Sequence, residues 1–148
     1  MTGFLLDADW VIQAQAGYQP AARVLRRLPG PSVSISWATI AEIYEGAFNT
    51  PNPSARVEVF RRFLYTYRKL ALNESIVERF AELRAFLRRR GEMLAEFDVF
   101  LAATALEYDL TVLTFNVRHL RRIPDLKLYQ PGSQADVDFS VPRAHRVG

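Results

Sequence analysis

Short apolar segments alternate along this chain with longer segments that have the periodicity of helices. We expect strands at the apolar segments 3–7, 32–36, 70–72, 110–114 and 126–129. We expect helices at 9–15, 20–28, from Ser36 or Thr39 to about Phe48, at 54–69, from Asn73 or Ser75 to about Arg90, and at 98–108. Strands that alternate with helices in this way form a parallel sheet covered by helices. The sequence therefore predicts an α/β fold.

The length of the chain indicates a single domain. Its 148 residues are enough to bury a hydrophobic core, and residues 1–130 contain every predicted strand and helix. From Pro131 the chain becomes polar and irregular, so we expect 131–148 to be a tail without an assigned function. No apolar run is long enough to cross a membrane, and no signal-peptide pattern follows Met1. We therefore expect a cytoplasmic protein that does not contact a membrane.

The composition restricts the metal chemistry that the chain can support. It has no cysteine, which excludes disulfides, thiolate metal sites and a cysteine nucleophile. Its only histidines, His119 and His145, are too few for a zinc site built mainly on imidazole. Any metal is therefore expected to be a hard cation with oxygen ligands. The basic residues are 17 arginines and two lysines; arginine suits phosphate binding, although codon bias or surface ion pairs also produce arginine-rich chains.

Polar residues follow two of the predicted strands. Asp7 lies at the end of the first strand, and Asn116 lies just past the 110–114 strand, after Thr114. In a parallel α/β sheet, ligands bind at the carboxyl ends of the strands. We therefore expect Asp7 and Asn116 to share one crevice, where a cation can offset the cost of burying Asp7.

Two further carboxylates can reach the same crevice. Glu42 lies about one and a half turns into the helix after the second strand, although an exposed helix glutamate is the commoner case and Glu45 competes with it. Asp98 begins the apolar segment DVFLAATAL, where a carboxylate also suits the helix dipole. Converging carboxylates repel each other, and a divalent cation removes that conflict. Oxygen ligands favour Mg²⁺ or Mn²⁺, which in such sites catalyse phosphodiester hydrolysis.

Four segments resemble the PIN-domain ribonucleases, and most closely the VapC-type toxins of bacterial and archaeal toxin–antitoxin pairs. They are FLLDADWVI, VSISWATIAEIYEGA, LRRRGEMLAEFDVFLAATAL and LTVLTFNVRHLRRIPDLKL, in family order over about residues 3–129. The resemblance implies a three-layer α/β/α PIN-like fold with a mainly parallel central sheet. It also implies a metal-dependent endoribonuclease that hydrolyses RNA, forms a homodimer and is paired with a VapB-type antitoxin.

The resemblance assigns roles to the acidic residues. It implies that Asp7, Glu42 and Asp98 are the metal ligands, with Mg²⁺ or Mn²⁺ as the cofactor. It favours Glu42 over Glu45, because residues 46–47 match the small pair that follows the family's glutamate.

Three more positions match the family pattern or depart from it. Asn116 falls at the fourth polar position, which favours one metal ion over two, and Thr114 matches a hydroxyl that supports the first acid. Asp9 stands where family members usually have Asn, and we favour a cap of the following helix over a second acid at the site. For RNA contact we prefer the arginines beside the proposed crevice to the group 88–90; these are Arg118, Arg121 and Arg122.

Two other functions remain open from the sequence. An apolar run followed by Asp7 and Asp9 also resembles the opening of the haloacid dehalogenase phosphatases, with Asp7 as nucleophile and Asp9 as acid and base. Trp10 and Val11 do not supply the threonine of that family, and neither lysine lies in a suitable context. The second alternative is a catalytically inactive PIN-fold module that binds RNA or protein.

Overall fold

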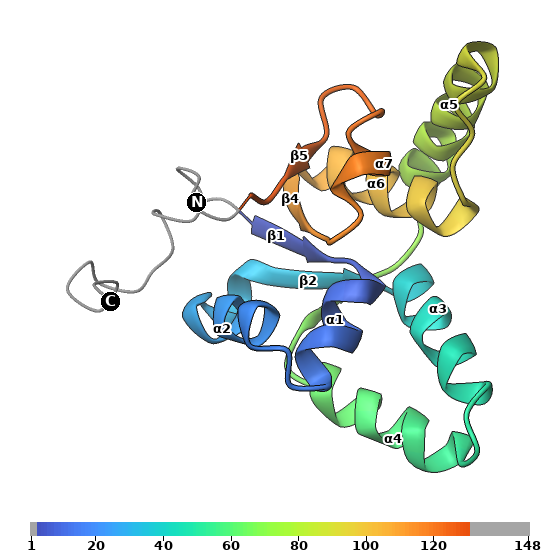
Figure 1. Ribbon diagram of the computed structural model, residues 1–148. Helices are drawn as coiled ribbons and strands as arrows, with labels where there is room; N and C mark the ends of the chain where they lie inside the picture. Colours follow the sequence, from blue (N-terminus) through green and yellow to red (C-terminus); the bar gives the residue numbers. More distant parts are fainter. Residues whose placement is uncertain (1–2, 131–148) are drawn as a thin grey trace.

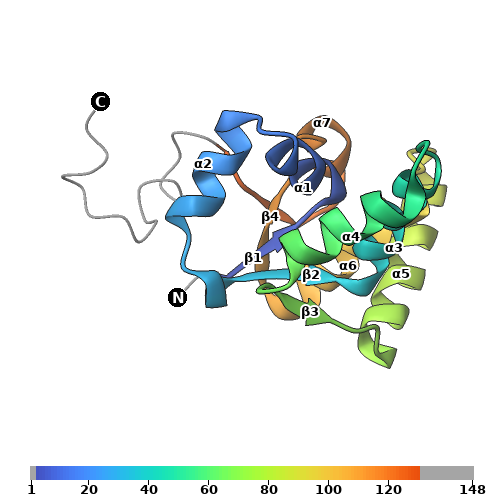
Figure 2. The ribbon, with the colours of Figure 1, turned by 90° about the horizontal axis from the view of Figure 1, so that it is seen from below.

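The computed structural model describes residues 3–130 and shows a five-stranded sheet with helices on both faces (Figure 1). The strands are β1 (Gly3–Leu6), β2 (Val33–Ser36), β3 (Arg68–Leu70), β4 (Leu110–Leu113) and β5 (Lys127–Leu128). All neighbouring strands are parallel, in the order β3-β2-β1-β4-β5. Figure 2 shows four of them in this order, from β4 across β1 and β2 to β3. The predicted α/β fold with a parallel central sheet is confirmed.

Helices connect the strands and form the two outer layers. They are α1 (Ala8–Gln15), α2 (Gln19–Arg27), α3 (Trp37–Phe48), α4 (Pro53–Leu64), α5 (Glu74–Arg90), α6 (Glu96–Tyr108) and α7 (Val117–Leu120), with a short 3₁₀ turn at Gly30–Ser32. Apolar residues of α1 to α4 form one core with the sheet, and those of α5, α6 and α7 form a second core. The predicted three-layer arrangement is therefore present.

The central strand β1 contributes side chains to both cores. Phe4 and Leu6 belong to the core under α1 to α4, whereas Leu5 belongs to the core under α5 to α7. Successive side chains of a strand point to opposite faces of the sheet, so a strand covered on both sides is apolar throughout. This explains the uninterrupted apolar run that precedes Asp7.

Predicted caps define the N-terminal ends of two helices, α3 and α5. The Ser36 hydroxyl accepts a 3.0 Å hydrogen bond from the Thr39 N–H, so Ser36 rather than Thr39 caps α3. The Asn73 side chain accepts a 2.9 Å bond from the Ile76 N–H and caps α5. Gly91 ends α5 with φ of 68°, a conformation that glycine adopts without steric cost.

The segment after α4 differs from the prediction. The expected helix 54–69 ends at Leu64, and the expected strand 70–72 is instead β3, which begins two residues earlier and ends at Leu70. Leu70 is buried, but Leu72 is 48% exposed, so the apolar character of Leu72 does not reflect burial. Pairing with β2 sets the register of this edge strand, because Ser34 pairs with Arg68 and Ser36 with Leu70.

One further difference concerns the C-terminal part of the chain. The short helix α7 was not predicted, because four residues are too few to show a helical period. The predicted tail, 131–148, lies outside the described residues. Among the residues that the structure describes, no helix combines the length and apolar character needed to cross a membrane.

Candidate functional site

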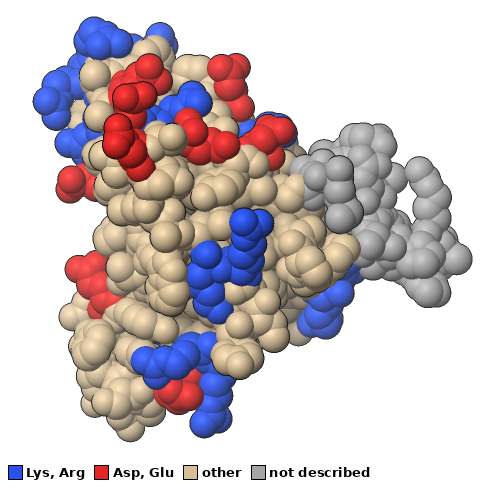
Figure 3. All heavy atoms as spheres, turned by 180° about the vertical axis from the view of Figure 1, so that it is seen from behind, with Lys and Arg blue, Asp and Glu red and all other residues tan. Residues whose placement is uncertain are grey.

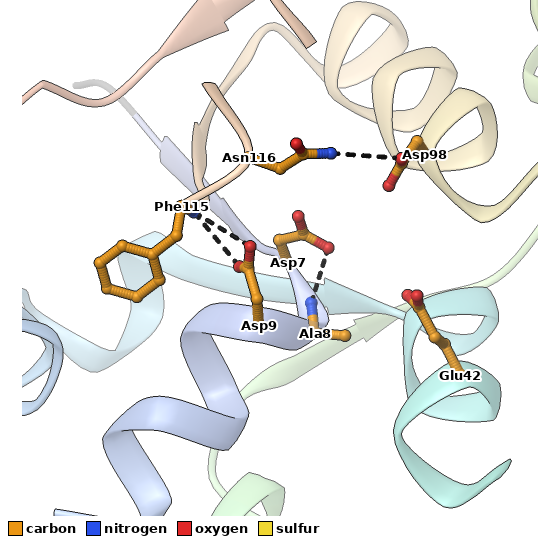
Figure 4. Close-up of a pocket in the computed structure, with 7 residues that line it drawn as sticks. All are labelled: Asp7, Ala8, Asp9, Glu42, Asp98, Phe115 and Asn116. Atoms are coloured by element: carbon orange, nitrogen blue, oxygen red, sulfur yellow. Dashed lines mark hydrogen bonds between the residues drawn. The ribbon is translucent and has the colours of Figure 1, made fainter. Parts of the chain in front are cut away.

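A cavity of about 380 Å³ opens at the carboxyl ends of β1 and β4. Within the sheet, β1 has β2 as its neighbour on one side and β4 as its neighbour on the other, so the strand order reverses at β1. Crevices at such a reversal of strand order are the usual ligand sites of parallel α/β sheets. Four of the seven lining residues are acidic (Figure 4); the lining consists of Asp7, Ala8, Asp9, Glu42, Asp98, Phe115 and Asn116.

Asp7 is fixed by donors from two elements. It directly follows β1, is only 6% exposed, and caps α1 by accepting a 2.7 Å hydrogen bond from the Ala8 N–H. The Thr114 hydroxyl, at the end of β4, donates a second 2.7 Å bond to Asp7 Oδ2. Burial raises the pKa of Asp7, while the bonds from Thr114 and Ala8 oppose the rise. The carboxylate is thus held in one orientation by neutral donors.

Asp9 lies in the first turn of α1 and does not cap it. Its carboxylate accepts hydrogen bonds of 3.1 and 3.3 Å from the Phe115 N–H, and therefore ties α1 to the loop after β4. The preferred prediction of Asp9 as the helix cap is wrong, because Asp7 occupies the cap position. Burial and the charge of Asp7 raise the pKa of Asp9 to about 7.

Glu42 extends from α3 into the same cavity (Figure 4). Burial raises its pKa to about 7, together with the charges of Asp7, Asp98, Asp9 and Glu45 in that order. Glu45, the competing glutamate, is exposed and does not line the cavity. The structure thus places Glu42 of α3 at the acidic cavity and Glu45 outside it.

Asp98 and Asn116 meet across the cavity. Asp98 lies in the first turn of α6, and the Asn116 side-chain amide donates a 3.3 Å hydrogen bond to its Oδ2. The Asn116 side-chain oxygen lies 2.6 Å from His119 Nδ1, so the imidazole orients the amide. Burial and the charge of Asp7 raise the pKa of Asp98, while His119 lowers it.

The donor set fits a hard divalent cation. Every ionisable group that lines the cavity, among the described residues, is a carboxylate, and burial together with mutual repulsion raises the pKa values of these groups. A divalent cation would relieve that repulsion. Within residues 3–130, no three His, Cys, Asp or Glu side chains are grouped closely enough to surround an ion by themselves. Magnesium commonly binds through one or two carboxylates and retains several waters, so it does not need three direct ligands.

The family model described as PIN domain matches residues 4–126, which include all the residues that line the cavity. The chain belongs to the PIN domain family. A haloacid dehalogenase phosphatase is not favoured, since the PIN domain accounts for β1 to β4 and for the acidic cavity.

The sequence similarity to two relatives extends over nearly the whole PIN domain. "Ribonuclease VapC1" of Haemophilus influenzae (strain R2866) is 28% identical over 126 residues, which are 84% of this chain and 94% of the relative. The "tRNA(fMet)-specific endonuclease VapC" of Salmonella typhimurium is 26% identical over 128 residues, or 86% of this chain and 97% of the relative.

Solved structures show the same fold. The crystal structure of DNA-bound VapBC from Salmonella typhimurium contains a chain with a TM-score of 0.80 and 26% identity, matched over 87% of this PIN domain chain and 98% of that chain. VapBC-1 from nontypeable Haemophilus influenzae gives a TM-score of 0.75 at 26% identity, over 86% and 96% of the two chains. The chain is thus similar to a chain in each of these two VapBC structures.

The arginines predicted to contact RNA lie outside the acidic cavity of the PIN domain. Arg118 and Arg121 are exposed and Arg122 is half-buried, and all three lie on or after α7. On the face opposite to the view of Figure 1, basic side chains occur in separate groups and do not form one continuous surface (Figure 3). A role of these arginines in RNA binding therefore remains a prediction.

Sequence reasoning missed two parts of the site. It assigned His119 no part in the site, whereas the imidazole Nδ1 of this exposed residue lies 2.6 Å from the Asn116 side-chain oxygen. The spacing of three residues between Asn116 and His119 was the available signal, because such residues are neighbours on a helical turn. It did not consider Phe115. This residue lines the cavity and donates its backbone N–H to Asp9, a contact that nothing in the local sequence indicates.

Proposed function

We propose that this PIN domain is a Mg²⁺- or Mn²⁺-dependent endoribonuclease, the toxin of a VapBC-type pair. The observation that carries the proposal is the convergence of Asp7, Asp9, Glu42 and Asp98 on one cavity at the carboxyl ends of β1 and β4. The names of the relatives, "Ribonuclease VapC1" and "tRNA(fMet)-specific endonuclease VapC", support RNA as the substrate.

Asp7, Glu42 and Asp98 would hold the metal ion together with its bound waters, one or two of them directly and the rest through water. When bound, the ion supplies positive charge at the phosphate group and lowers the pKa of the attacking water. The protein contributes orientation. Thr114 and the Ala8 N–H fix Asp7, and Asn116 fixes Asp98, so both carboxylates are positioned before the substrate binds.

The remaining side chains support this arrangement. Asn116 would contact the substrate or position Asp98, and its amide is itself oriented by His119. Asp9 would hold the loop after β4 through the Phe115 N–H rather than bind the metal directly. Arg118, Arg121 and Arg122 would attract the phosphate backbone of the RNA.

The same comparisons support a protein partner for this chain. Two of the similar structures are VapBC assemblies, which supports a cognate VapB-type antitoxin for this chain. We further propose a homodimer that acts on RNA in the cytoplasm. An inactive binding module is a weaker alternative, because the carboxylates needed for metal binding are present and oriented.

A single substitution tests the nuclease. Asp7→Asn keeps the shape of the side chain but removes its charge, so we expect it to abolish cleavage of a structured RNA in Mn²⁺. The wild-type protein in chelator is the matched negative control. Unchanged metal-dependent cleavage by Asp7→Asn would overturn the proposed function, and RNA binding without cleavage by the wild-type protein in Mn²⁺ would indicate the inactive module.

A further inference from the structure

A second cavity, of about 320 Å³, adjoins the acidic one and has a different chemical character. Among residues 3–130 its lining is aromatic, aliphatic and basic with one threonine, and contains no carboxylate: Trp10, Pro20, Arg23, Val24, Arg27, Thr114, Phe115, Val117 and Tyr129. Phe115 lines both cavities, and Thr114, which lines this second cavity, donates its hydroxyl hydrogen to Asp7. The two cavities are therefore neighbours that share Phe115 as a wall.

Phe115 provides a partly exposed aromatic surface on a rigid support. Its ring stacks on Trp10 with centroids 4.5 Å apart and an interplanar angle of 11°. Trp10 is only 3% exposed, donates its indole N–H to the Ala21 carbonyl, and is packed edge-on by Tyr129. Phe115 nevertheless remains 44% exposed, and Tyr18, at 48% exposure, lies 5.8 Å from it. The Phe115 ring thus borders both cavities with part of its surface exposed, and the exposed Tyr18 ring packs against it.

The position of the Phe115 ring relative to the acidic cavity is fixed by the backbone. The Phe115 N–H donates to both oxygens of Asp9, and the ring projects away from Asp7 and Asp98 (Figure 4). Because the backbone makes this bond, a substitution of the Phe115 side chain leaves the donor in place. The ring is therefore a fixed neighbour of the candidate metal site and can be altered separately from it.

The charges of the aromatic cavity complement a nucleotide. Arg23 and Arg27 of α2 reach it, and guanidinium groups bind phosphate and stack on bases. Aromatic rings beside basic side chains are the usual means of holding unpaired bases, since every base presents a face for stacking. The acidic cavity cannot hold a base in this way, because its other lining residues are carboxylates, an amide and an alanine.

We propose that this aromatic cavity binds the unpaired base of a nucleotide that flanks the cleaved phosphodiester bond. The base stacks on the exposed surface of Phe115, and Arg23 contacts its phosphate. The proposal rests on the nuclease function proposed above and specifies its substrate as RNA whose bases are splayed out of a helix. A base within a duplex cannot reach the cavity, so loops and single strands are the substrates that fit.

Binding to a defined RNA tests the base site. The cut is first mapped with the wild-type protein, and a fluorescein-labelled single-stranded RNA that spans it is then titrated with Asp98→Asn protein in Mg²⁺, so that the RNA stays intact. In this background we expect Phe115→Leu to weaken binding roughly 5- to 100-fold, the range for loss of one stacked base. Phe115→Tyr keeps the ring and is expected to bind as before.

A change in the RNA complements the substitution in the protein. An abasic nucleotide beside the cut is expected to weaken binding to the parent protein by a similar factor and to remove the difference between the parent and Phe115→Leu. Arg23→Ala is expected to weaken binding and reduce its salt dependence. Arg26→Ala is the matched control, because Arg26 lies on the same helix outside the cavity and bonds to Gln19.

The outcomes separate this proposal from the nuclease function. Cleavage by the wild-type protein, together with equal RNA affinity of Phe115→Leu and its parent, overturns the base site and leaves the nuclease intact. If the abasic nucleotide weakens RNA binding equally in the parent and in Phe115→Leu, the base site is likewise overturned and the nuclease is unaffected. If Phe115→Leu weakens binding of a VapB-type antitoxin but not of RNA, the cavity belongs to a protein partner and the proposal fails. If the wild-type protein neither binds nor cleaves RNA in Mn²⁺, both proposals fail.

Discussion

The Thr114 hydroxyl donates a 2.7 Å hydrogen bond to Asp7 Oδ2 and so joins the ends of two adjacent strands, β4 and β1. The same hydroxyl accepts a 2.9 Å bond from the Asn116 N–H. Both Asp7 and Thr114 are buried. One threonine therefore fixes the carboxylate at the centre of the candidate site and the start of the loop that carries Asn116.

Removal of this hydroxyl is expected to affect both stability and activity. Thr114→Val keeps the shape of the side chain but leaves the buried Asp7 without one of its two donors. We expect a loss of about 1–3 kcal/mol in the free energy of unfolding, measured by urea denaturation, together with slower RNA cleavage. Thr114→Ser retains the hydroxyl and serves as the control. Equal stability of the Val and Ser variants would contradict the role assigned to this bond.

The two glutamates of α3 provide a matched comparison. Glu42 lines the acidic cavity, whereas Glu45 is exposed on the same helix. We expect Glu42→Gln to slow cleavage about 100-fold or more, the size of effect seen when one electrostatic contact to a reacting group is removed. Glu45→Gln should stay close to the wild-type rate. Rates of metal-dependent cleavage under identical conditions check this, and similar losses in both variants would argue against a specific role of Glu42.

Sequence patterns predicted the placement of Asp7 and Asn116 for a definite physical reason. Asp7 and Asn116 each follow a buried parallel strand, and the carboxyl ends of parallel strands meet at one edge of the sheet. Glu42 required the additional resemblance to a family, because a helix offers Glu45 only three residues away. The fold class followed similarly from the alternation of strands and helices.

The remaining errors arose where tertiary contacts override local patterns. Asp9 was expected to cap the helix, but its carboxylate is bound by Phe115, which is 106 residues away in the sequence. The register of β3 depends on pairing with β2, and the exposed Leu72 gave a misleading apolar signal. Local propensity contains no information about either contact.

The position of Asp9 leads to a prediction about charge and hydrogen bonding. Asp9→Asn retains an oxygen acceptor for the Phe115 N–H, whereas Asp9→Ala removes it. We expect the Asn variant to retain most of the cleavage activity and the Ala variant to lose a larger part, because the loop after β4 is then untied. A loss in the Asn variant as large as in the Ala variant, measured as cleavage rate in Mn²⁺, would instead indicate that the charge of Asp9 acts on the metal.

The raised pKa values predict how stability depends on pH when no metal is bound. The pKa of Asp9 and the pKa of Glu42 are both about 7 in the folded protein, and they return to about 4 in the unfolded chain. The folded state therefore binds more protons than the unfolded state between these values, so stability is lost as the pH rises through about 7. We expect the thermal unfolding midpoint in chelator to fall between about pH 5 and about pH 8.

Two comparisons assign this pH dependence to the acidic cavity. Glu42→Gln removes one of the repelling charges, so its midpoint in chelator should fall less steeply and exceed the wild-type value at the upper end of the pH range. Mg²⁺ should raise the midpoint of the wild-type protein there, because the cation offsets the same repulsion. The carboxylates of Glu58 and Glu92 have lowered pKa values, so they change the stability only at more acidic pH, outside this range. A midpoint that is independent of pH in chelator, or one that Glu42→Gln leaves equally steep, would show that the carboxylates do not repel one another as the cavity geometry requires.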